Sequence, residues 1–454
     1  MIKKIFVLFL AVITIMLSSV SGAVFAEENE PEVYGKAAIL MDMDTGRILF
    51  GKNIDEKIYP ASTTKIMTAT LILEMCGDDL GKTVVASDIV DSVIGTGASH
   101  IGIRPGEELT VEQLLYAVLV ASANEACDVL AQYVCSGSTD AFVELMNQKA
   151  SELGMENTHF TNTHGFHDDN HYTTARDMAM LTRYAMKNEK FREIVKTPSY
   201  TIPKTNKYNY GDGTRTLSNT SDLIKPGFAA YYKYATGVKT GYTSEAGNCL
   251  VASATKESSN SAVKSNMNFI AATFNSQDEK NVSRKYSDVK NMFEYGFNNF
   301  KMISVATPGE DVGETKIFAG KGTDVVSAVS YSEVSALLPS DTDTDKQIEK
   351  KYTYFENIKA PIKKGDKIGS AQYIYTNEKT GEKITLATTD LVAKNDIDKD
   401  WFKQFFSFIK KIFTSAFFVV IIIIIIILGI VLSVMRNQRK KRRRKFLKSR
   451  KYGR

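Results

Sequence analysis

A serine and a lysine three residues apart, Ser62 and Lys65, are the residues of this sequence best suited to covalent chemistry. Apolar residues recur at helical spacing after Pro60, which predicts a helix that begins at about Ser62. Residues three apart share a helix face, so the Lys65 amine can meet the Ser62 hydroxyl. A lysine that is desolvated beside other cations can lose its proton near neutral pH and then deprotonate a serine. The spacing therefore predicts a Ser-Lys nucleophile.

Two further short motifs carry polar side chains suited to peptide chemistry. Ser122-Ala123-Asn124 interrupts a helical pattern, so we expect its hydroxyl and carboxamide on a loop that aims them into a cleft. Lys239-Thr240-Gly241 is expected on a strand, where an ammonium and a hydroxyl can bind a carboxylate and Gly241 lets a substrate approach the backbone. Capping of the next helix is the alternative for the first motif, and a hairpin turn for the second.

None of these motifs is specific by itself. Further matches occur at Ser253/Lys256, Ser261/Lys264, Ser287/Lys290, Ser407/Lys410, Ser258-Ser259-Asn260 and Lys379-Thr380-Gly381. The second Lys-Thr-Gly lies between two predicted strands among Asn, Glu and Lys residues, and we interpret it as a turn. The case for chemistry therefore depends on the elements that hold the first set of motifs.

The first part of the chain predicts a mixed fold. Strands are expected at Ala37–Met43, Arg47–Lys52, Tyr231–Val238, Asn248–Ala254 and Met267–Asn275, with a short extended piece at Ser99–Arg104. Helices are expected from Ser62, from the capping box at Thr110 to Leu119, after an interruption at residues 121–124 to Val134, and at Phe142–Leu153, Thr174–Lys187 and Val289–Phe300. Strands at both ends and helices in the middle predict an α+β domain over residues 27–304, with one antiparallel sheet covered by helices.

The pattern changes at about residue 305 to short strands and turns. Strands are expected at Glu314–Phe318, Val325–Tyr331, Lys351–Phe355, Gly369–Tyr375 and Lys383–Thr388, with a loop at residues 340–350. We predict a small all-β domain over residues 305–398.

Both ends of the chain carry targeting signals. Positive charges, an apolar run and small residues predict a secretory signal peptide over residues 1–26. Residues 399–416 predict an amphipathic helix in the membrane interface, and the uncharged residues 417–435 are long enough to cross a bilayer. Residues 436–454 hold twelve Lys or Arg and no acid, which predicts a cytoplasmic tail. The expected protein is a single-pass protein of the cell membrane whose body lies outside the cell.

Composition excludes some classes of function. The 454-residue chain has a net charge of +5, and removing the twelve positive charges of the tail leaves −7. An acidic body with a basic terminal segment is not typical of a nucleic-acid-binding protein. The four cysteines, Cys76, Cys127, Cys135 and Cys249, show no metal or disulfide spacing, and we interpret them as buried free thiols.

In their order, the three motifs resemble the set shared by penicillin-binding proteins and class A β-lactamases. The chain is similar to low-molecular-mass penicillin-binding proteins of the D-alanyl-D-alanine carboxypeptidase type over about residues 33–300, and residues 305–395 are similar to that family's C-terminal β domain. The similarity includes residues 37–42, 152–160, 164–166, 171–177 and 360–369. Many relatives end with an amphipathic helix alone, whereas this chain adds a membrane span and a basic tail.

The resemblance implies a serine peptidase that works by acyl transfer without a cofactor or a metal. Ser62, deprotonated by Lys65, would attack the carbonyl of the penultimate D-Ala of a peptidoglycan stem pentapeptide. The backbone N–H groups of Ser62 and Tyr242 would hold the oxyanion. β-Lactam antibiotics would acylate the same serine as covalent inhibitors.

The resemblance also implies roles for the other motif residues. Ser122 would pass a proton to the leaving D-Ala, and Asn124 would hold the peptide amide. Lys239 and Thr240 would bind the terminal carboxylate, and water would then release the acyl-enzyme.

Several alternatives remain open at this point. An amine can intercept the same acyl-enzyme, which would give a D,D-endopeptidase or a transpeptidase. A β-lactamase would need a Glu-x-x-Leu-Asn motif, and Glu144-Leu-Met-Asn147 has the wrong spacing. A catalytically inactive peptidoglycan-binding module is disfavoured by the intact Ser62 and Lys65.

A metal site is the alternative from another class of enzyme. A polar segment collects possible zinc ligands at His164, His167, Asp168, Asp169 and His171. Because the chain has no His-Glu-x-x-His helix, and polar loops gather such residues freely, we favour the serine mechanism over a zinc peptidase.

Overall fold

The structure is a computed structural model that describes residues 30–451, except for residues 78, 94–96, 259–262, 264, 379 and 414–415. The predicted signal peptide, residues 1–26, lies outside the described residues. The chain divides into two compact units, Met1–Ile303 with Leu337–Thr342 and Ser304–Ala336 with Asp343–Arg454.

The first unit is built on an antiparallel sheet of five strands in the order β2-β1-β9-β8-β7. The strands are β1 (Ala37–Asp42), β2 (Ile48–Lys52), β7 (Ala235–Thr243), β8 (Gly247–Glu257) and β9 (Asn266–Phe274). Successive side chains of a strand point to opposite faces, and every residue of β1 is buried, so both faces of the sheet are covered. Strand β7 forms one edge of this sheet, where a peptide can reach its backbone.

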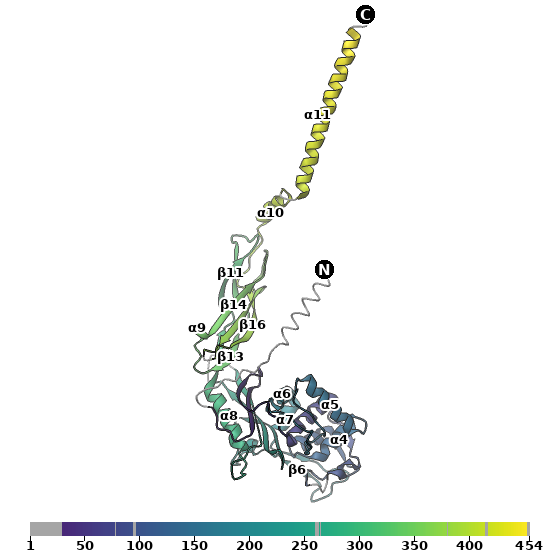
Figure 1. Ribbon diagram of the computed structural model, residues 1–454, viewed down its shortest axis with the longest axis vertical. Coiled ribbons are helices and arrows are strands. Elements are labelled where there is room, and N and C mark those ends of the chain that lie inside the picture. The colour runs from purple at the N-terminus through teal and green to yellow at the C-terminus, as the bar shows by residue number, and fades with distance from the viewer. Residues whose placement is uncertain are drawn as a thin grey trace. The chain divides into compact units, whose positions relative to one another are not determined.

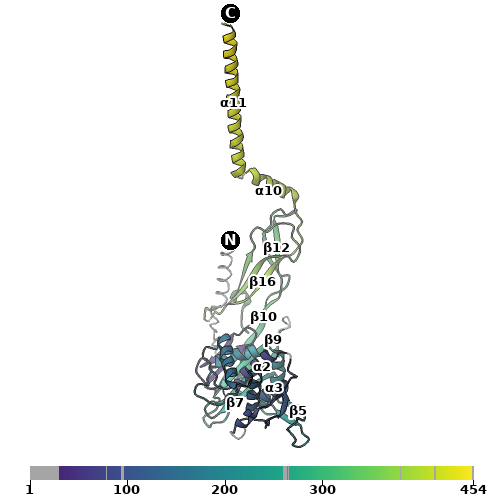
Figure 2. The ribbon, with the colours of Figure 1, turned by 90° about the vertical axis from the view of Figure 1, so that its right-hand side faces the viewer.

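Helices cover the two faces of the sheet (Figure 1). One face carries α8 (Lys285–Asn299), in which Gly296 lies close against Leu40 and Phe269. The other face carries the main core, with α2 (Lys65–Cys76), α3 (Val111–Leu119), α4 (Asn124–Val134), α5 (Thr139–Glu152), α6 (Ala175–Ala185) and α7 (Glu189–Val195). Figure 2 shows α2 and α3 within this helical layer. The predicted α+β class, an antiparallel sheet covered by helices, is confirmed.

Short elements complete the first unit. They are the 3-10 turns η1 (Ala61–Thr64), η2 (Asp88–Ser92) and η3 (Asp222–Ile224), and the hairpins of β3 (Thr83–Val85) with β4 (Glu108–Thr110) and of β5 (Ser199–Ile202) with β6 (Arg215–Ser218). The predicted capping box is present, since Gln113 N donates to Thr110 Oγ1 at 3.1 Å and Thr110 N donates to Gln113 Oε1 at 2.8 Å.

The structure refines three local predictions. Ser62 lies in the 3-10 turn η1, and α2 begins only at Lys65, because the Thr63 and Thr64 hydroxyls donate to the carbonyls three residues back. The strand predicted at Tyr231–Val238 starts at Ala235 and continues through the Lys-Thr-Gly motif. The segment Ser99–Arg104 has no regular secondary structure.

The second unit is mostly β-structure. Its five-stranded sheet has the order β11-β12-β16-β15-β14, with β11 (Asp311–Lys316), β12 (Val325–Ser330), β14 (Ile348–Tyr354), β15 (Lys367–Thr376) and β16 (Lys383–Ala393). The strands β10 (Phe300–Ala306) and β13 (Val334–Pro339) pair with each other, and the residues of each strand are divided between the two units. The predicted loop at residues 340–350 also contains the one-turn helix α9 (Thr344–Gln347) and the start of β14. The second Lys-Thr-Gly lies between β15 and β16, with Lys379 outside the described residues.

Two helices end the chain, α10 (Trp401–Phe413) and α11 (Ala416–Lys451). The aromatic side chains of α10 are exposed, among them Trp401 and Phe402. By its length and composition, the segment Val419–Lys445 of α11 is able to cross a membrane, and it is the one such helix in the described part of the chain.

Candidate active site

The predicted nucleophile Ser62 lies in a tight turn above the helix that carries Lys65. Ala61, just before it, has a φ of +47°, which turns the chain sharply at this point. The Lys65 amine lies 2.9 Å from Ser62 Oγ. The structure thus brings together the two residues that the spacing predicted to meet.

Lys65 is fully buried and has three oxygen neighbours. Its Nζ lies 2.9 Å from Ser62 Oγ, 2.7 Å from Asn124 Oδ1 and 2.7 Å from the His164 carbonyl oxygen. A neutral amine has two N–H groups and one lone pair. The Asn124 Oδ1 and the His164 carbonyl oxygen can only accept, so they take the two N–H groups of the neutral Lys65 amine. Its lone pair then remains to accept the Ser62 hydroxyl proton.

The surroundings of Lys65 favour this neutral form. Burial lowers the pKa of Lys65 to about 8, against the smaller opposing effects of Cys127, Asp128 and Glu125. Since removal from water disfavours the charged form of a lysine, about a tenth of Lys65 is a free base at pH 7, far more than for an exposed lysine.

The Ser122-Ala123-Asn124 motif lies on the break between α3 and α4. Ser122 has a φ of +63°, Ala123 N donates to the Ala117 carbonyl, and Asn124 N donates to the Ser99 carbonyl at 2.9 Å. These backbone bonds fix the break between the helices and turn Asn124 toward Lys65. The Asn124 side chain therefore binds the lysine, in addition to any contact with a substrate.

The Lys-Thr-Gly motif lies on the edge strand β7. Lys239 is buried, and burial, with the nearby Lys65 as the next cause, holds its pKa well below the usual range. Thr240 Oγ1 donates to Thr220 Oγ1 at 2.7 Å. The hairpin-turn alternative is excluded, because the turn lies further along the chain, between Thr243 and Gly247.

The structure gives a second reason for a glycine at position 241, which the sequence did not reveal. A Cβ on Gly241 would lie 3.0 Å from the Pro60 carbonyl oxygen and 3.1 Å from Ser62 N. The turn that holds the nucleophile therefore packs directly on β7, and glycine is needed for this approach. Tyr242, which follows, is exposed.

The motif residues meet at one cavity of about 540 Å³. Six of the predicted site residues line it: Ser62, Ser122, Asn124, Thr240, Gly241 and Tyr242. Lys65 and Lys239 lie buried beneath it. Phe166, Thr220 and Lys285 also line this cavity and were missed in the sequence, where no spacing connects them to the motifs. His167 lines it too, although the sequence suggested it only as a zinc ligand.

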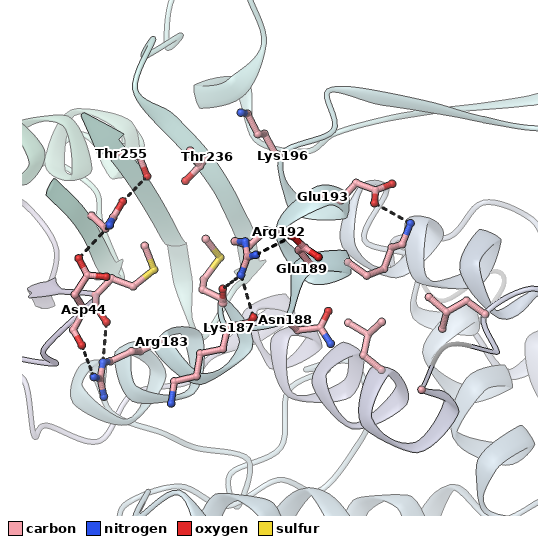
Figure 3. A pocket seen from close by; sticks show the side chains of 17 residues that line it. Asp44, Arg183, Lys187, Asn188, Glu189, Arg192, Glu193, Lys196, Thr236 and Thr255 are labelled. Carbon is pink, nitrogen blue, oxygen red and sulfur yellow. Dashed lines mark hydrogen bonds and ion pairs between the residues drawn. The ribbon is translucent and has the colours of Figure 1, made fainter. Parts of the chain in front are cut away.

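A larger groove of about 1190 Å³ lies elsewhere in the same unit (Figure 3). It is lined by charged side chains that bind neighbouring groups: Arg183 donates to the Met43 and Asp44 carbonyls, and Arg192 to those of Met186 and Lys187. None of the serines of the three motifs lines it. The smaller cavity, with a serine next to a buried lysine, is therefore the candidate active site.

The histidines that were considered as zinc ligands contact different groups in the structure. His171 lies 2.8 Å from Thr64 Oγ1 and accepts the Thr161 N–H, and burial lowers the pKa of His171 to about 4. His167 packs edge-on against Tyr59. Among the residues that the structure describes, no three His, Cys, Asp or Glu side chains are grouped as metal ligands.

Comparison with known proteins agrees with this geometry. Residues 24–277 match the family described as D-alanyl-D-alanine carboxypeptidase, and residues 300–399 match the penicillin-binding protein 5 C-terminal domain. The D-alanyl-D-alanine carboxypeptidase DacF of Bacillus subtilis is 33% identical over 401 residues, which are 87% of this chain and 95% of that protein. The chain belongs to the D-alanyl-D-alanine carboxypeptidase family.

The chain is also similar in structure to solved proteins. Penicillin binding protein 5 from Haemophilus influenzae superposes with a TM-score of 0.61 at 26% identity, over 82% of this chain and 100% of that one. The Streptomyces DD-transpeptidase superposes with a TM-score of 0.52 at 33% identity, over 60% of this chain and 99% of that one. The predicted relation to low-molecular-mass penicillin-binding proteins is confirmed.

Proposed function

We propose that this carboxypeptidase removes the terminal D-alanine from peptidoglycan stem pentapeptides through an acyl-enzyme on Ser62. As a member of its family it is a serine-type hydrolase, and its substrates are peptides that end in D-Ala-D-Ala. The observation that supports Ser62 is the buried Lys65 amine, 2.9 Å from its hydroxyl at the base of the cavity.

In the first half of the reaction, Ser62 Oγ attacks the carbonyl carbon of the penultimate D-Ala while its proton moves to Lys65. The C–O bond forms, and the carbonyl oxygen takes up the negative charge between the backbone N–H groups of Ser62 and Tyr242. Loss of one such donor costs about 3–4 kcal/mol in other acyl-transfer enzymes. The C–N bond then breaks, and the leaving D-Ala amine receives a proton through Ser122.

In the second half, a water molecule takes the place of the leaving group. Lys65 accepts a proton from this water, the hydroxide attacks the ester carbonyl, and Ser62 is released with its proton restored. Asn124 holds the peptide amide at the start and keeps the Lys65 amine in place throughout. An amine can attack the acyl-enzyme in place of this water. Transpeptidation products formed with added D-amino acids are therefore measured beside the released D-alanine.

The terminal carboxylate of the substrate is bound on β7 in this proposal. Lys239 and Thr240 supply an amine and a hydroxyl, and Lys285 on α8 is a further cation that lines the cavity. A carboxylate beside Lys239 favours its charged form and so offsets the effect of burial. Penicillin carries a carboxylate too, which explains how a β-lactam would use the same receptor and acylate Ser62.

We infer that the protein is exported by residues 1–26 and is held in the cell membrane by residues 417–435. The apolar length of α11 supports the anchor, and the twelve basic residues of 436–454 support a cytoplasmic tail. Residues 399–416 would lie in the outer interface, so that the peptidase domain 27–304 and the β domain 305–398 face the wall.

Mass spectrometry of the full-length protein with penicillin tests the nucleophile. We expect one covalent adduct on the Ser62 peptide and none in the variant Ser62→Ala. A D-Ala-D-Ala peptide should release D-alanine only with the unmodified enzyme. An adduct that persists in Ser62→Ala, or activity that is lost with EDTA and restored by zinc, would contradict the proposal.

A further inference from the structure

One turn below the catalytic pair lies a second layer of buried polar groups that the mechanism above does not use. Thr68 follows Lys65 by one turn in α2, and Asp128 follows Asn124 by one turn in α4. The Thr68 hydroxyl donates to the Thr163 carbonyl, and the Thr163 hydroxyl donates to the Asp128 carboxylate. This layer joins α2, α4 and the loop that follows Phe160.

Asp128 is a carboxylate in an unusual position. Its side chain is only 10% exposed, and its second oxygen lies 3.9 Å from His164 Nε2. Burial lowers the pKa of His164 to about 3, so this ring is neutral and does not balance the charge. Burial raises the pKa of Asp128 to about 6, and Thr163 and Lys65 favour its ionised form.

The segment that Asp128 holds also contacts the catalytic lysine. Thr163 is bound to Asp128, and the carbonyl of the next residue, His164, accepts a hydrogen bond of 2.7 Å from Lys65 Nζ. Asp128 is therefore linked to Lys65 in two ways, through the position of this carbonyl and through its negative charge.

We propose that Asp128 is a positioning residue for the acylation of Ser62, because its carboxylate holds the Thr163–His164 segment against Lys65 and makes the lysine amine a stronger base. This proposal rests on the function proposed above. It assigns a role in the reaction to a residue outside the three motifs.

Other titratable groups face Lys65 as well. They are Glu125 and Cys127 on α4, His164 and His171 in the loop, and Lys239 on β7. Burial raises the pKa of Cys127 to about 12, so the thiol is uncharged. Glu125 accepts the N–H groups of Ile101 and Gly102 and holds that loop. Asp128 is thus the ionised side chain that both faces Lys65 and binds its contact segment.

Asp128→Asn removes the charge and keeps an oxygen that can accept from Thr163. The measurement is the rate constant for acylation of the full-length protein by penicillin, from pH 5.5 to 10. The rate rises with pH as Lys65 loses its proton. Because a nearby carboxylate favours the charged form of lysine, we expect the variant to shift this rise to lower pH by roughly 0.5–1 unit. Asp128→Glu should keep the rise close to its original position.

The control is Asp177→Asn. Asp177 is also a buried aspartate of the first unit, but its carboxylate accepts from Asn157 N and Thr158 Oγ1, and its backbone N–H donates to Thr174 Oγ1. Its variant should lose stability and keep the pH profile.

An unchanged profile in folded Asp128→Asn, or a rise moved to higher pH, would overturn this role. If the asparagine variant does not fold, Asp128→Ser also removes the charge and allows the same measurement. Absence of any penicillin adduct on the unmodified enzyme would instead contradict the proposed function itself, so the two failures are distinguishable.

Discussion

Two lysines of the first unit, Lys65 in the active-site cavity and Lys190 in the larger groove, have the same side chain and opposite electrostatic surroundings. Lys65 is fully buried and binds only uncharged oxygens, and its pKa falls to about 8. Lys190 is 30% exposed and lies 3.1 Å from Glu112 and 2.8 Å from Glu193. The hydrogen bonds to Glu193 and Glu112 raise the pKa of Lys190.

The difference shows what makes a lysine into a base. Burial removes the water that stabilises an ammonium, and a bonded carboxylate replaces that stabilisation. At Lys190 the carboxylates are in direct contact, so the lysine is a permanent cation. At Lys65 the acids Asp128 and Glu125 contribute from a distance and bind other groups, so that part of the lysine is neutral at pH 7.

The largest effect is expected from Lys65→Arg. Arginine keeps the positive charge and cannot lose its proton in a protein, so it cannot act as the base for Ser62. We expect acylation by penicillin to fall by at least about 10³-fold, since removing one member of a nucleophile–base unit removes most of its effect. Stopped-flow or gel-based labelling with a fluorescent penicillin measures this rate.

Lys190→Arg is the matched control for that variant. Arginine can keep the ion pairs with Glu112 and Glu193, and the rate should stay within about twofold because an exposed pair contributes little. If both variants lost activity to the same extent, the distinction between the two lysines would be wrong.

The next largest effect concerns Lys239, the second buried lysine of the site. Lys239→Gln keeps much of the side-chain volume and removes the charge that would bind the substrate carboxylate. We expect hydrolysis of a D-Ala-D-Ala peptide to fall by roughly 10–10²-fold in kcat/KM, since a charge-assisted bond contributes about 1.5–3 kcal/mol. The C-terminal amide of the same peptide, which has no carboxylate to bind, should be affected much less. Equal losses on both substrates would mean that Lys239 acts on the proton of the nucleophile or on the fold.

A smaller effect is expected in the pH dependence of the unmodified enzyme. Only the neutral form of Lys65 accepts a proton, and the pKa of this lysine is about 8. Acylation should therefore increase about tenfold per pH unit on the acid side and level off above pH 8. A profile with its midpoint near pH 10.5, the ordinary lysine value, would show that Lys65 is not desolvated as described.

The last effect is expected in stability, where the two lysines should differ between pH 8 and pH 10. The pKa of Lys65 is lowered by folding, so the cost of burying its charge is full below pH 8 and disappears toward pH 10.5. Relative to Lys65→Met, the free energy of unfolding of the wild type should rise across this window, by up to about 3 kcal/mol. The pKa of Lys190 is raised, so its contribution is full below its ordinary value and is lost at higher pH. Urea unfolding at pH 8 and pH 10 lies inside the window of Lys65 and below that of Lys190, so the wild type should gain stability relative to Lys65→Met and stay unchanged relative to Lys190→Met. Equal changes in the two comparisons would contradict this difference.

Much of this protein was determined by local sequence. The i and i+3 spacing of Ser62 and Lys65 places both on one side of a helical segment, and this relation does not depend on the rest of the chain. The capping box at Thr110 is local too, since its two side chain–backbone hydrogen bonds join residues three apart. The break at Ser122 is only partly local, because Asn124 N donates to the distant Ser99 carbonyl. The apolar segments predicted the strands of the sheet, and the resemblance to a known family predicted the activity.

Some errors were local as well, and they have a physical cause. The start of α2 was misplaced by three residues, because threonine hydroxyls bind the preceding carbonyls and tighten the first turn into a 3-10 helix. The strand expected from Tyr231 starts only at Ala235, because Tyr231 N and Ala235 N donate in turns to the Phe228 and Tyr232 carbonyls.

Tertiary structure alone decided the properties that make the site reactive. The contacts of Lys65 with Asn124 and the His164 carbonyl join residues that are 59 and 99 positions apart in the sequence. No periodicity relates such positions, because their distance is set by how α2, α4 and a loop pack together. The same holds for Gly241 against the nucleophile turn and for Asp128 beneath it. Burial is also a property of the packed fold, and it is burial that gives Lys65 a pKa suited to a base.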